Sequence, residues 1–198
     1  MKHLILLCSV LILAGCTQTA ETPPVVTDTP LEKTDAPIAK SQVIKIDEWF
    51  DFGCGHCRNV HGTMKSLKKK YGDKLEVTER HFPLSAQTFV FAEASECARS
   101  QGKFAEFQDK VFTDYFGKFT VENINKIATE INIPDAKTFA TCVSSGAQKD
   151  KVTADIQAAE RLGVTGTPFF QINGELNVPG AISEQSFESL FKQILEDQ

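Results

Sequence analysis

The chain has 198 residues, of which 41% are hydrophobic and fifteen are phenylalanine, enough to build one folded core with an insertion. Its formal net charge of −5 and its lack of a large basic cluster give no support for nucleic-acid binding. The densest basic run, Lys68-Lys69-Lys70, is typical of the solvated end of a helix.

Residues 1–15 have the pattern of a signal segment. Met1-Lys2-His3 is followed by about ten apolar residues, too few to cross a bilayer as a helix. The segment leads into Leu13-Ala14-Gly15-Cys16, which resembles the lipobox of bacterial lipoproteins. This resemblance implies cleavage before Cys16 and acylation of that residue. An ordinary secretory signal that is cut nearby and leaves a soluble product stays open as the alternative.

Residues 16–41 differ abruptly in composition from the rest of the chain. Four of the eight prolines occur here among Thr, Glu, Asp and Ala, so there is little apolar surface to bury. We expect a lipid-modified Cys16 followed by a disordered, partly extended tether. This segment is too short and too polar to be a dimerisation domain.

A strand, a cysteine pair and a helix follow in direct succession. Residues 42–52 are rich in β-branched and aromatic side chains, which is typical of a buried strand. Cys54-Gly55-His56-Cys57 comes next and opens a helix expected to run to about Lys70. A second strand is expected over Lys74 to Phe82. This order favours a parallel βαβ unit. The thiols then lie at a strand-to-helix turn, where free N–H groups and the helix dipole stabilise a thiolate.

Residues 86–163 indicate helices almost throughout, with glycines and a proline marking their ends. The expected helices cover Gln87 to Gln101, the region of Phe104 to Phe112, Thr120 to Ile131, Pro134 to Gly146, and Gln148 to Leu162. Aromatic side chains at helical spacing in this block predict the core of a helical bundle.

The C-terminal part returns to strand character. Phe169 to Ile172, the turn Asn173-Gly174 and Leu176 to Val178 predict a β-hairpin. Ser183 to Leu195 predicts a final amphipathic helix. The element order is therefore β-α-β, a helical block, and β-β-α.

This order, with Cys-x-x-Cys opening the first helix and Thr167-Pro168 leading the hairpin, resembles the α/β thioredoxin fold. The helical block resembles that of the DsbA-type branch of thiol–disulfide oxidoreductases. The resemblance implies a thioredoxin-fold domain of residues 42–85 and 164–198 around an inserted helical domain of residues 86–163. It also implies a cis bond at Pro168, which would face the active cysteines, and substrate binding near Thr167 and Pro168.

The same resemblance assigns roles around the cysteine pair. Cys54 is the expected nucleophile, favoured as a thiolate by helix-terminal N–H groups and nearby His56, and Cys57 is the resolving thiol. Glu48, six residues before Cys54, corresponds to a buried acid that relays the proton of the buried cysteine. An ordinary exposed strand acid is the alternative for Glu48.

The remaining cysteines and histidines have structural interpretations. The spacing of Cys97 and Cys142 resembles that of an extra structural disulfide in many members of this branch, and a second redox relay is the alternative. His61 and His81 would suit a metal site, but isolated histidines on a helix face and a strand end are usually structural. We expect no metal and no cofactor.

The sequence thus predicts an extracytoplasmic, lipid-anchored thiol–disulfide oxidoreductase that oxidises cysteines of exported proteins. Its expected partners are reduced exported proteins, a membrane redox partner that recycles the cysteine pair, and the membrane itself; we expect a monomer. Gly55 occupies the position that is proline in DsbA, which predicts a milder oxidant. The alternatives are an envelope reductase or isomerase, a metal-binding module that uses Cys54 and Cys57, or an inactive scaffold.

Overall fold

The computed structural model describes residues 41–195. The expected signal segment, Cys16 and nearly all of the expected tether lie outside the described residues. No helix in the described part of the chain is both long and apolar enough to cross a membrane.

A four-stranded sheet forms the centre of the fold. Its strands are β1 (Ile44–Phe50), β2 (Leu75–His81), β3 (Phe169–Ile172) and β4 (Leu176–Pro179), in the spatial order β2-β1-β3-β4. β1 pairs with β2 in parallel, whereas β3 is antiparallel to both β1 and β4. The expected parallel βαβ unit and the C-terminal hairpin are both confirmed. Asn173 and Gly174 both have positive φ, as the tight turn of this hairpin requires.

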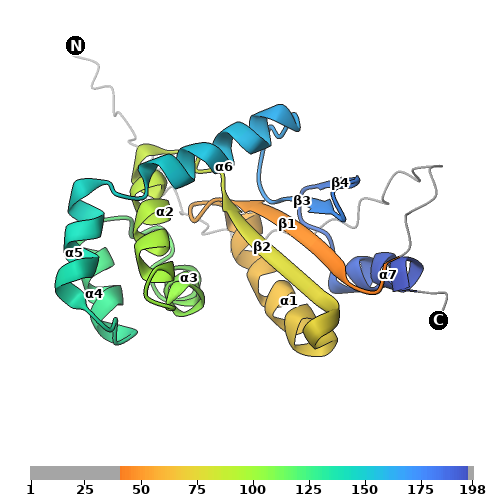
Figure 1. The fold of residues 1–198 in the computed structure, drawn as a ribbon, viewed down its shortest axis with the longest axis horizontal. Helices are drawn as coiled ribbons and strands as arrows, with labels where there is room; N and C mark the ends of the chain where they lie inside the picture. The colour runs from red at the N-terminus through yellow and green to blue at the C-terminus, as the bar shows by residue number, and fades with distance from the viewer. Residues whose placement is uncertain (1–40, 196–198) are drawn as a thin grey trace, which may run out of the picture.

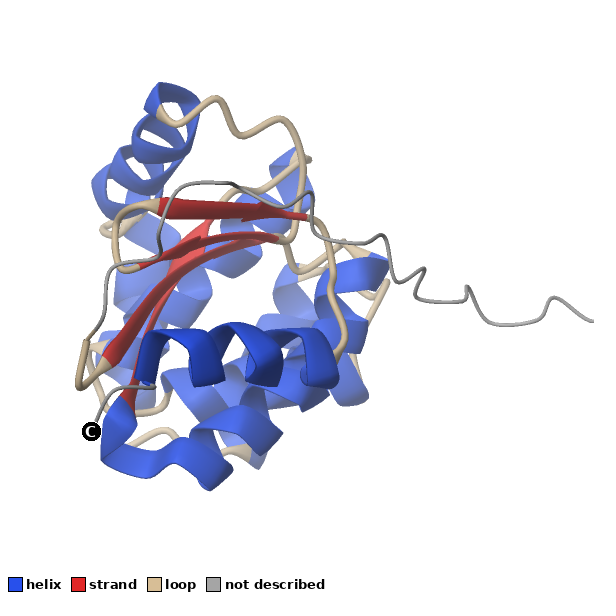
Figure 2. Cartoon of the chain, turned by 90° about the vertical axis from the view of Figure 1, so that its right-hand side faces the viewer, coloured by secondary structure: helices blue, strands red, loops and turns tan. Residues whose placement is uncertain are grey.

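Helices cover both faces of the sheet (Figure 2). α1 (Gly55–Tyr71) and α7 (Glu184–Leu195) pack on one face, where the alternating residues of β1 supply Ile44 and Ile46 to the core. α6 (Lys149–Arg161) packs on the other face, where Trp49 contacts Ala159. A 3₁₀ turn, η1 (Gly72–Lys74), connects α1 to β2.

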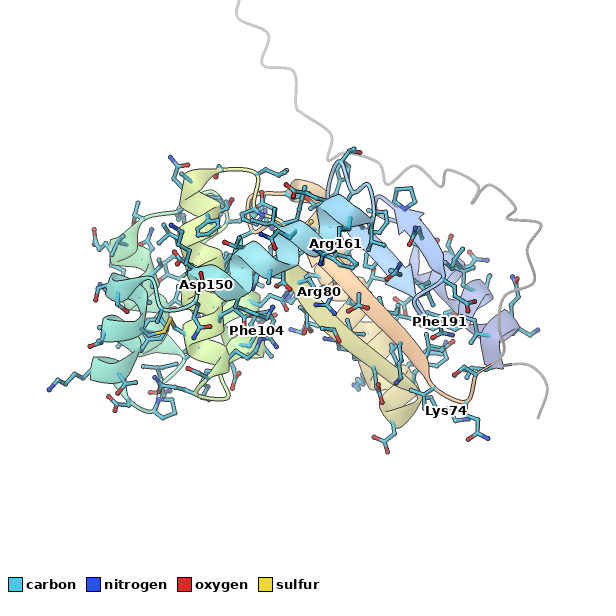
Figure 3. The ribbon with its side chains drawn as sticks, turned by 45° about the horizontal axis from the view of Figure 1, so that its top comes forward. Lys74, Arg80, Phe104, Asp150, Arg161 and Phe191 are labelled. Atoms are coloured by element: carbon cyan, nitrogen blue, oxygen red, sulfur yellow. A yellow bond between two sulfur atoms is a disulfide. The ribbon has the colours of Figure 1, made fainter. Side chains whose placement is uncertain are left out.

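Four further helices form a block beside the sheet (Figure 1). They are α2 (Ala86–Arg99), α3 (Phe104–Thr113), α4 (Val121–Glu130) and α5 (Ala136–Ser145). Their aromatic core is continuous with Phe50, Phe52 and Cys57. The predicted bundle core therefore also buries one side of the cysteine pair. A disulfide with an S–S distance of 2.02 Å joins Cys97 of α2 to Cys142 of α5, and its yellow bond is visible in Figure 3.

α1 begins at Gly55 with Cys54 as its N-cap, so the cysteine pair opens this helix as predicted. Two other local details differ from the sequence prediction. α5 begins at Ala136 rather than Pro134, because the Asp135 carboxylate accepts the Thr138 N–H at 2.9 Å and caps the helix.

The second difference concerns α6, which belongs to the helical insertion in sequence but covers the sheet in space. The indole N–H of Trp49 donates to the carbonyl oxygen of Asp155 at 3.0 Å, and Arg80 reaches the Asp155 carboxylate at 3.4 Å. Figure 3 shows Arg80 on β2 beside α6. The last helix of the insertion therefore completes the sheet domain.

Candidate active site

The two free cysteines lie at the junction of β1 and α1 and differ strongly in exposure. Cys54 is half-buried at the N-cap of α1, in an extended conformation, and Cys57 is only 1% exposed in the first turn. The Cys57 N–H donates to the Cys54 sulfur at 3.4 Å. The N-cap places the first sulfur where backbone N–H groups of the helix are unpaired.

These contacts favour a thiolate at Cys54. Hydrogen bonds from the Cys57 side chain, the Thr167 side chain and the backbone N–H groups of Cys57 and His56 lower the pKa of Cys54 to about 5, although partial burial opposes them. Cys54 is therefore ionised at neutral pH and reactive as a nucleophile.

The environment of Cys57 has the opposite effect. Burial raises the pKa of the Cys57 thiol far above its usual range, and the neighbouring Cys54 raises it further. Cys57 therefore keeps its proton and donates it in a hydrogen bond to the Cys54 thiolate. The pair holds one exposed anionic sulfur and one buried neutral sulfur.

Thr167 lies against this pair, and the peptide bond between Thr167 and Pro168 is cis. The Cys54 sulfur is 3.2 Å from the Thr167 carbonyl oxygen, to which its thiol form donates. The Thr167 side chain lowers the pKa of both sulfurs. The structure thus brings together three of the predicted site residues, Cys54, Cys57 and Thr167, and Pro168 follows Thr167 through the cis bond.

Glu48 is buried on the α1 face of β1, 5% exposed, and it is not an exposed strand acid. Burial raises the pKa of its carboxyl group to about 8; Glu79 raises it further, and Lys68 opposes both. Glu48 lines a cavity of about 270 Å³ with His61, Met64 and others. The charged groups that act on Glu48 are thus Glu79 and Lys68, rather than the sulfurs.

The histidines occupy three different environments. His56 is exposed, and its backbone N–H lowers the pKa of Cys54. The sequence-based prediction was that His56 itself favours the thiolate. His61 Nε2 lies 3.1 Å from Asp109 Oδ1, and His81 Nε2 lies 2.9 Å from Glu96 Oε1. Within residues 41–195, no three His, Cys, Asp or Glu side chains converge as metal ligands.

Asp51 is a site residue that was not predicted from the sequence. Its carbonyl oxygen accepts the Cys54 N–H at 3.1 Å, and its backbone contact lowers the pKa of Cys57. Its side chain is buried beside Gly53, and Oδ1 has no hydrogen-bond partner. One sequence feature could have identified Asp51. It is an acidic residue within the apolar run from Trp49 to Phe52, where a carboxylate has no obvious packing role.

The family model and the solved structures that match this chain agree on a thioredoxin-type fold. A family model described as thioredoxin matches residues 39–195. The thiol-disulfide exchange protein α-DsbA2 from Wolbachia pipientis superimposes with a TM-score of 0.68 at 23% identity, covering 78% of this chain and 84% of its own. A thioredoxin-like oxidoreductase from Silicibacter pomeroyi DSS-3 gives 0.67 at 22% identity, with coverages of 77% and 87%. These similarities show a shared fold, including the inserted helices.

The curated relatives carry a different name. The Na⁺/H⁺ antiporter NhaA of Herminiimonas arsenicoxydans is 32% identical over 127 residues, which are 64% of this chain and 20% of that protein. NhaA 1 of Mycobacterium sp. (strain KMS) is also 32% identical, over 65% of this chain and 21% of its own length. The chain therefore spans about a fifth of the length of these relatives, and their transport activity is a property of much longer proteins.

Proposed function

Because the chain belongs to the thioredoxin family, we propose that it is a thiol–disulfide oxidoreductase whose reactive pair is Cys54 and Cys57. The observation that carries the proposal is the asymmetry of the two sulfurs. Cys54 is accessible and its pKa is lowered to about 5, while Cys57 is buried and holds its proton. This arrangement suits a nucleophilic thiolate with a resolving thiol beside it.

In the oxidising direction, the enzyme begins with a Cys54–Cys57 disulfide. A substrate thiolate attacks the Cys54 sulfur, and the bond to Cys57 breaks; Cys57 leaves with the electron pair and takes up a proton. A second substrate thiolate then attacks the substrate sulfur of the mixed disulfide and releases Cys54 as a thiolate. Two electrons have passed from the substrate to the enzyme, and the substrate carries a new disulfide.

We favour oxidation over reduction because the contacts around Cys54 stabilise its thiolate and hence the reduced enzyme. An enzyme whose reduced form is stabilised gives up its disulfide readily and is an oxidant. Gly55-His56 is the dipeptide of protein disulfide isomerase, so we expect a potential near roughly −180 mV rather than the roughly −120 mV of DsbA.

The proposed substrates are reduced proteins outside the cytoplasm. An extended polypeptide would pair with the backbone near Thr167 and place its cysteine against Cys54, a mode that tolerates varied side chains. We further propose a lipid anchor at Cys16, a monomeric state, and a membrane redox partner that reoxidises the pair.

Two other site residues have proposed roles. Glu48, buried and with a pKa raised to about 8, would exchange a proton with Cys57 as the disulfide opens and closes. The Cys97–Cys142 disulfide would hold α2 and α5 together as a structural bond.

The test combines activity with the redox state in cells. The purified protein should oxidise a reduced peptide with two cysteines, and Cys54→Ser should abolish this reaction. Alkylation trapping in living cells should find the pair mostly oxidised; a mostly reduced pair would indicate a reductase or isomerase instead. Stoichiometric bound zinc without dithiol reactivity would favour the metal-binding alternative, and a chain with neither property would be a scaffold.

A further inference from the structure

The cavity beside Glu48 lies between the sheet and the helical block, where α3 runs alongside α1 (Figure 1). Its volume of about 270 Å³ is large enough for several water molecules. Its wall is largely ionisable: Glu48 from β1, Glu79 from β2, His61, Lys65 and Lys68 from α1, and Glu106 and Asp109 from α3. The ionisable side chains in this wall can act as hydrogen-bond partners for water in a cavity of this size.

The proposed reaction requires proton movement at a buried atom. Cys57 is 1% exposed, and its thiol must form and disappear once in every oxidation cycle. Glu48 can exchange this proton, but at 5% exposure it is itself remote from solvent. Glu48 carries one proton and would lose it after a single transfer to Cys57. It therefore needs a proton path to bulk water before the next cycle.

His61 is placed to make this connection. It lies one helical turn after Cys57, and its side chain is 12% exposed in the cavity wall. Its Nε2 atom is held at 3.1 Å by Asp109, whose side chain is 40% exposed and reaches the surface. In the described chain Nδ1 makes no hydrogen bond to protein, which leaves it available to a cavity water.

We propose that His61, positioned by Asp109, passes protons between Glu48 and solvent through this cavity. The inference rests on the proposed redox function. When the Cys54–Cys57 disulfide is reduced, Glu48 gives one proton to Cys57, and His61 returns one to Glu48 through water and recovers it from solvent. Reoxidation of the pair runs the same transfers in reverse, so protons balance in both half-reactions.

The other groups around His61 are less suited to this role. Lys65 and Lys68 are held in ion pairs with Asp109 and Glu79, and Arg99 also faces Glu79 at 3.8 Å. Glu106 and Asp109 are paired with lysines, which lower the pKa of each carboxyl group. Imidazole is the side chain that ordinarily titrates near pH 7. Burial lowers the pKa of His61, and the hydrogen bond to Asp109 partly opposes this effect.

The experiment measures single-turnover reduction of the oxidised full chain by a cysteine peptide between pH 5.5 and 8.5. His61→Ala should react more slowly by about a hundredfold, the lower end of the range of general acid–base catalysis, with the largest loss at high pH where protons are scarce. Added imidazole should restore the rate by occupying the vacated space. The equilibrium redox potential should not change, because a relay affects rates alone.

Two further variants separate a relay from a structural role. His61→Gln can keep the hydrogen bond to Asp109 but cannot titrate, so it should be slow and insensitive to imidazole while melting like the wild type. Lys65→Met removes the other partner of Asp109 and should show no response to imidazole. A His61→Gln rate equal to wild type across the pH range, or a slow His61→Ala without imidazole rescue, would overturn this inference alone. Wild-type protein without dithiol exchange would instead overturn the proposed function.

Discussion

The sulfur of Cys54 lies 3.2 Å from the carbonyl oxygen of Thr167, although 113 positions separate the two residues in the chain. The contact follows from sheet order. β3 pairs antiparallel with β1, so the residues that enter β3 meet those that leave β1 and open α1. The cysteine turn and the Thr167 backbone, where substrate is proposed to bind, therefore lie at the same end of these two central strands.

Alkylation of the reduced protein should follow the ionisation of Cys54. Its pKa is lowered to about 5, so the thiolate fraction should rise as pH rises through 5 and be nearly complete at pH 7. The measurement is the rate of iodoacetamide modification from pH 3.5 to 9, followed by mass spectrometry. Cys54→Ser should remove the fast phase, because Cys57 is buried and protonated. A midpoint near the ordinary thiol value of 9.0 would contradict the prediction.

Gly55→Pro should make the protein a stronger oxidant without disturbing its fold. Gly55 is the first residue of α1, a position that favours proline, and the extended Cys54 before it is compatible with a following proline. A Cβ at Gly55 would meet no atom within 4 Å. In glutathione buffers, the potential should move from roughly −180 toward roughly −120 mV.

The matched control for this substitution is Gly62→Ala, which lies within the same helix and also has open space around its Cβ. It should raise the free energy of unfolding by up to about 1 kcal/mol through helix propensity and leave the potential unchanged. An equal shift of potential in both variants would attribute the effect to helix stability instead of to the residue between the cysteines.

Much of this fold could be predicted because its signals are local. Glycines and prolines mark the element ends, and the Asn173-Gly174 turn fixes its hairpin. The position of α6 could not be predicted in this way. The apolar face formed by Val152 and Ala159 shows that the helix has a buried side, but periodicity does not reveal whether a bundle or a sheet covers it.

The candidate site was predictable to a similar extent. The cysteine pair and Thr167-Pro168 follow from recognisable motifs, and the structure brings them together. The charged neighbours of Glu48 depend instead on the register between β1 and β2, which places Glu48 opposite Glu79. Asp51 was not predicted for another reason. An acidic residue in an apolar run does not show from sequence alone whether its carboxylate is hydrogen-bonded in the fold.

Gly53→Ala should destabilise the protein through one methyl contact. A Cβ at this position would lie 3.0 Å from the Thr88 methyl carbon and 3.3 Å from Asp51 Oδ2, so a neighbour has to move. We expect a loss of about 1–3 kcal/mol in the free energy of unfolding, as for an overpacked core, measured with urea. Thr88→Ser removes the methyl and retains the hydroxyl of the α2 capping box, so Gly53→Ala/Thr88→Ser should recover most of this loss. A double variant as unstable as Gly53→Ala would locate the strain elsewhere.

Replacing Cys97 and Cys142 together by alanine should lower stability and spare the redox reaction. The closed loop has a sequence separation of 45, and the chain-entropy model gives about 4 kcal/mol as an upper figure for its contribution. Thermal unfolding should report the loss, while peptide oxidation below the melting temperature should stay near the wild-type rate. Complete loss of oxidation in the folded variant would support a second redox relay.

Glu48→Gln should remove a pH dependence from the stability of the wild-type protein. Burial raises the folded-state pKa of Glu48 to about 8 from an ordinary value of 4.5, so the folded chain holds a proton that the unfolded chain releases between these values. The contribution of protonated Glu48 to the free energy of unfolding is fully present below pH 4.5 and is lost as pH rises to 8. Over this range the free energy of unfolding should fall by a few kcal/mol. Melting temperatures from pH 4 to 9 should fall more steeply for wild type than for Glu48→Gln. Glu76→Gln, an exposed acid on β2 paired with Lys45, should retain the wild-type slope. Parallel wild-type and Glu48→Gln profiles would show that Glu48 is ionised in the fold at neutral pH, and Glu48 could not then supply the proton to Cys57.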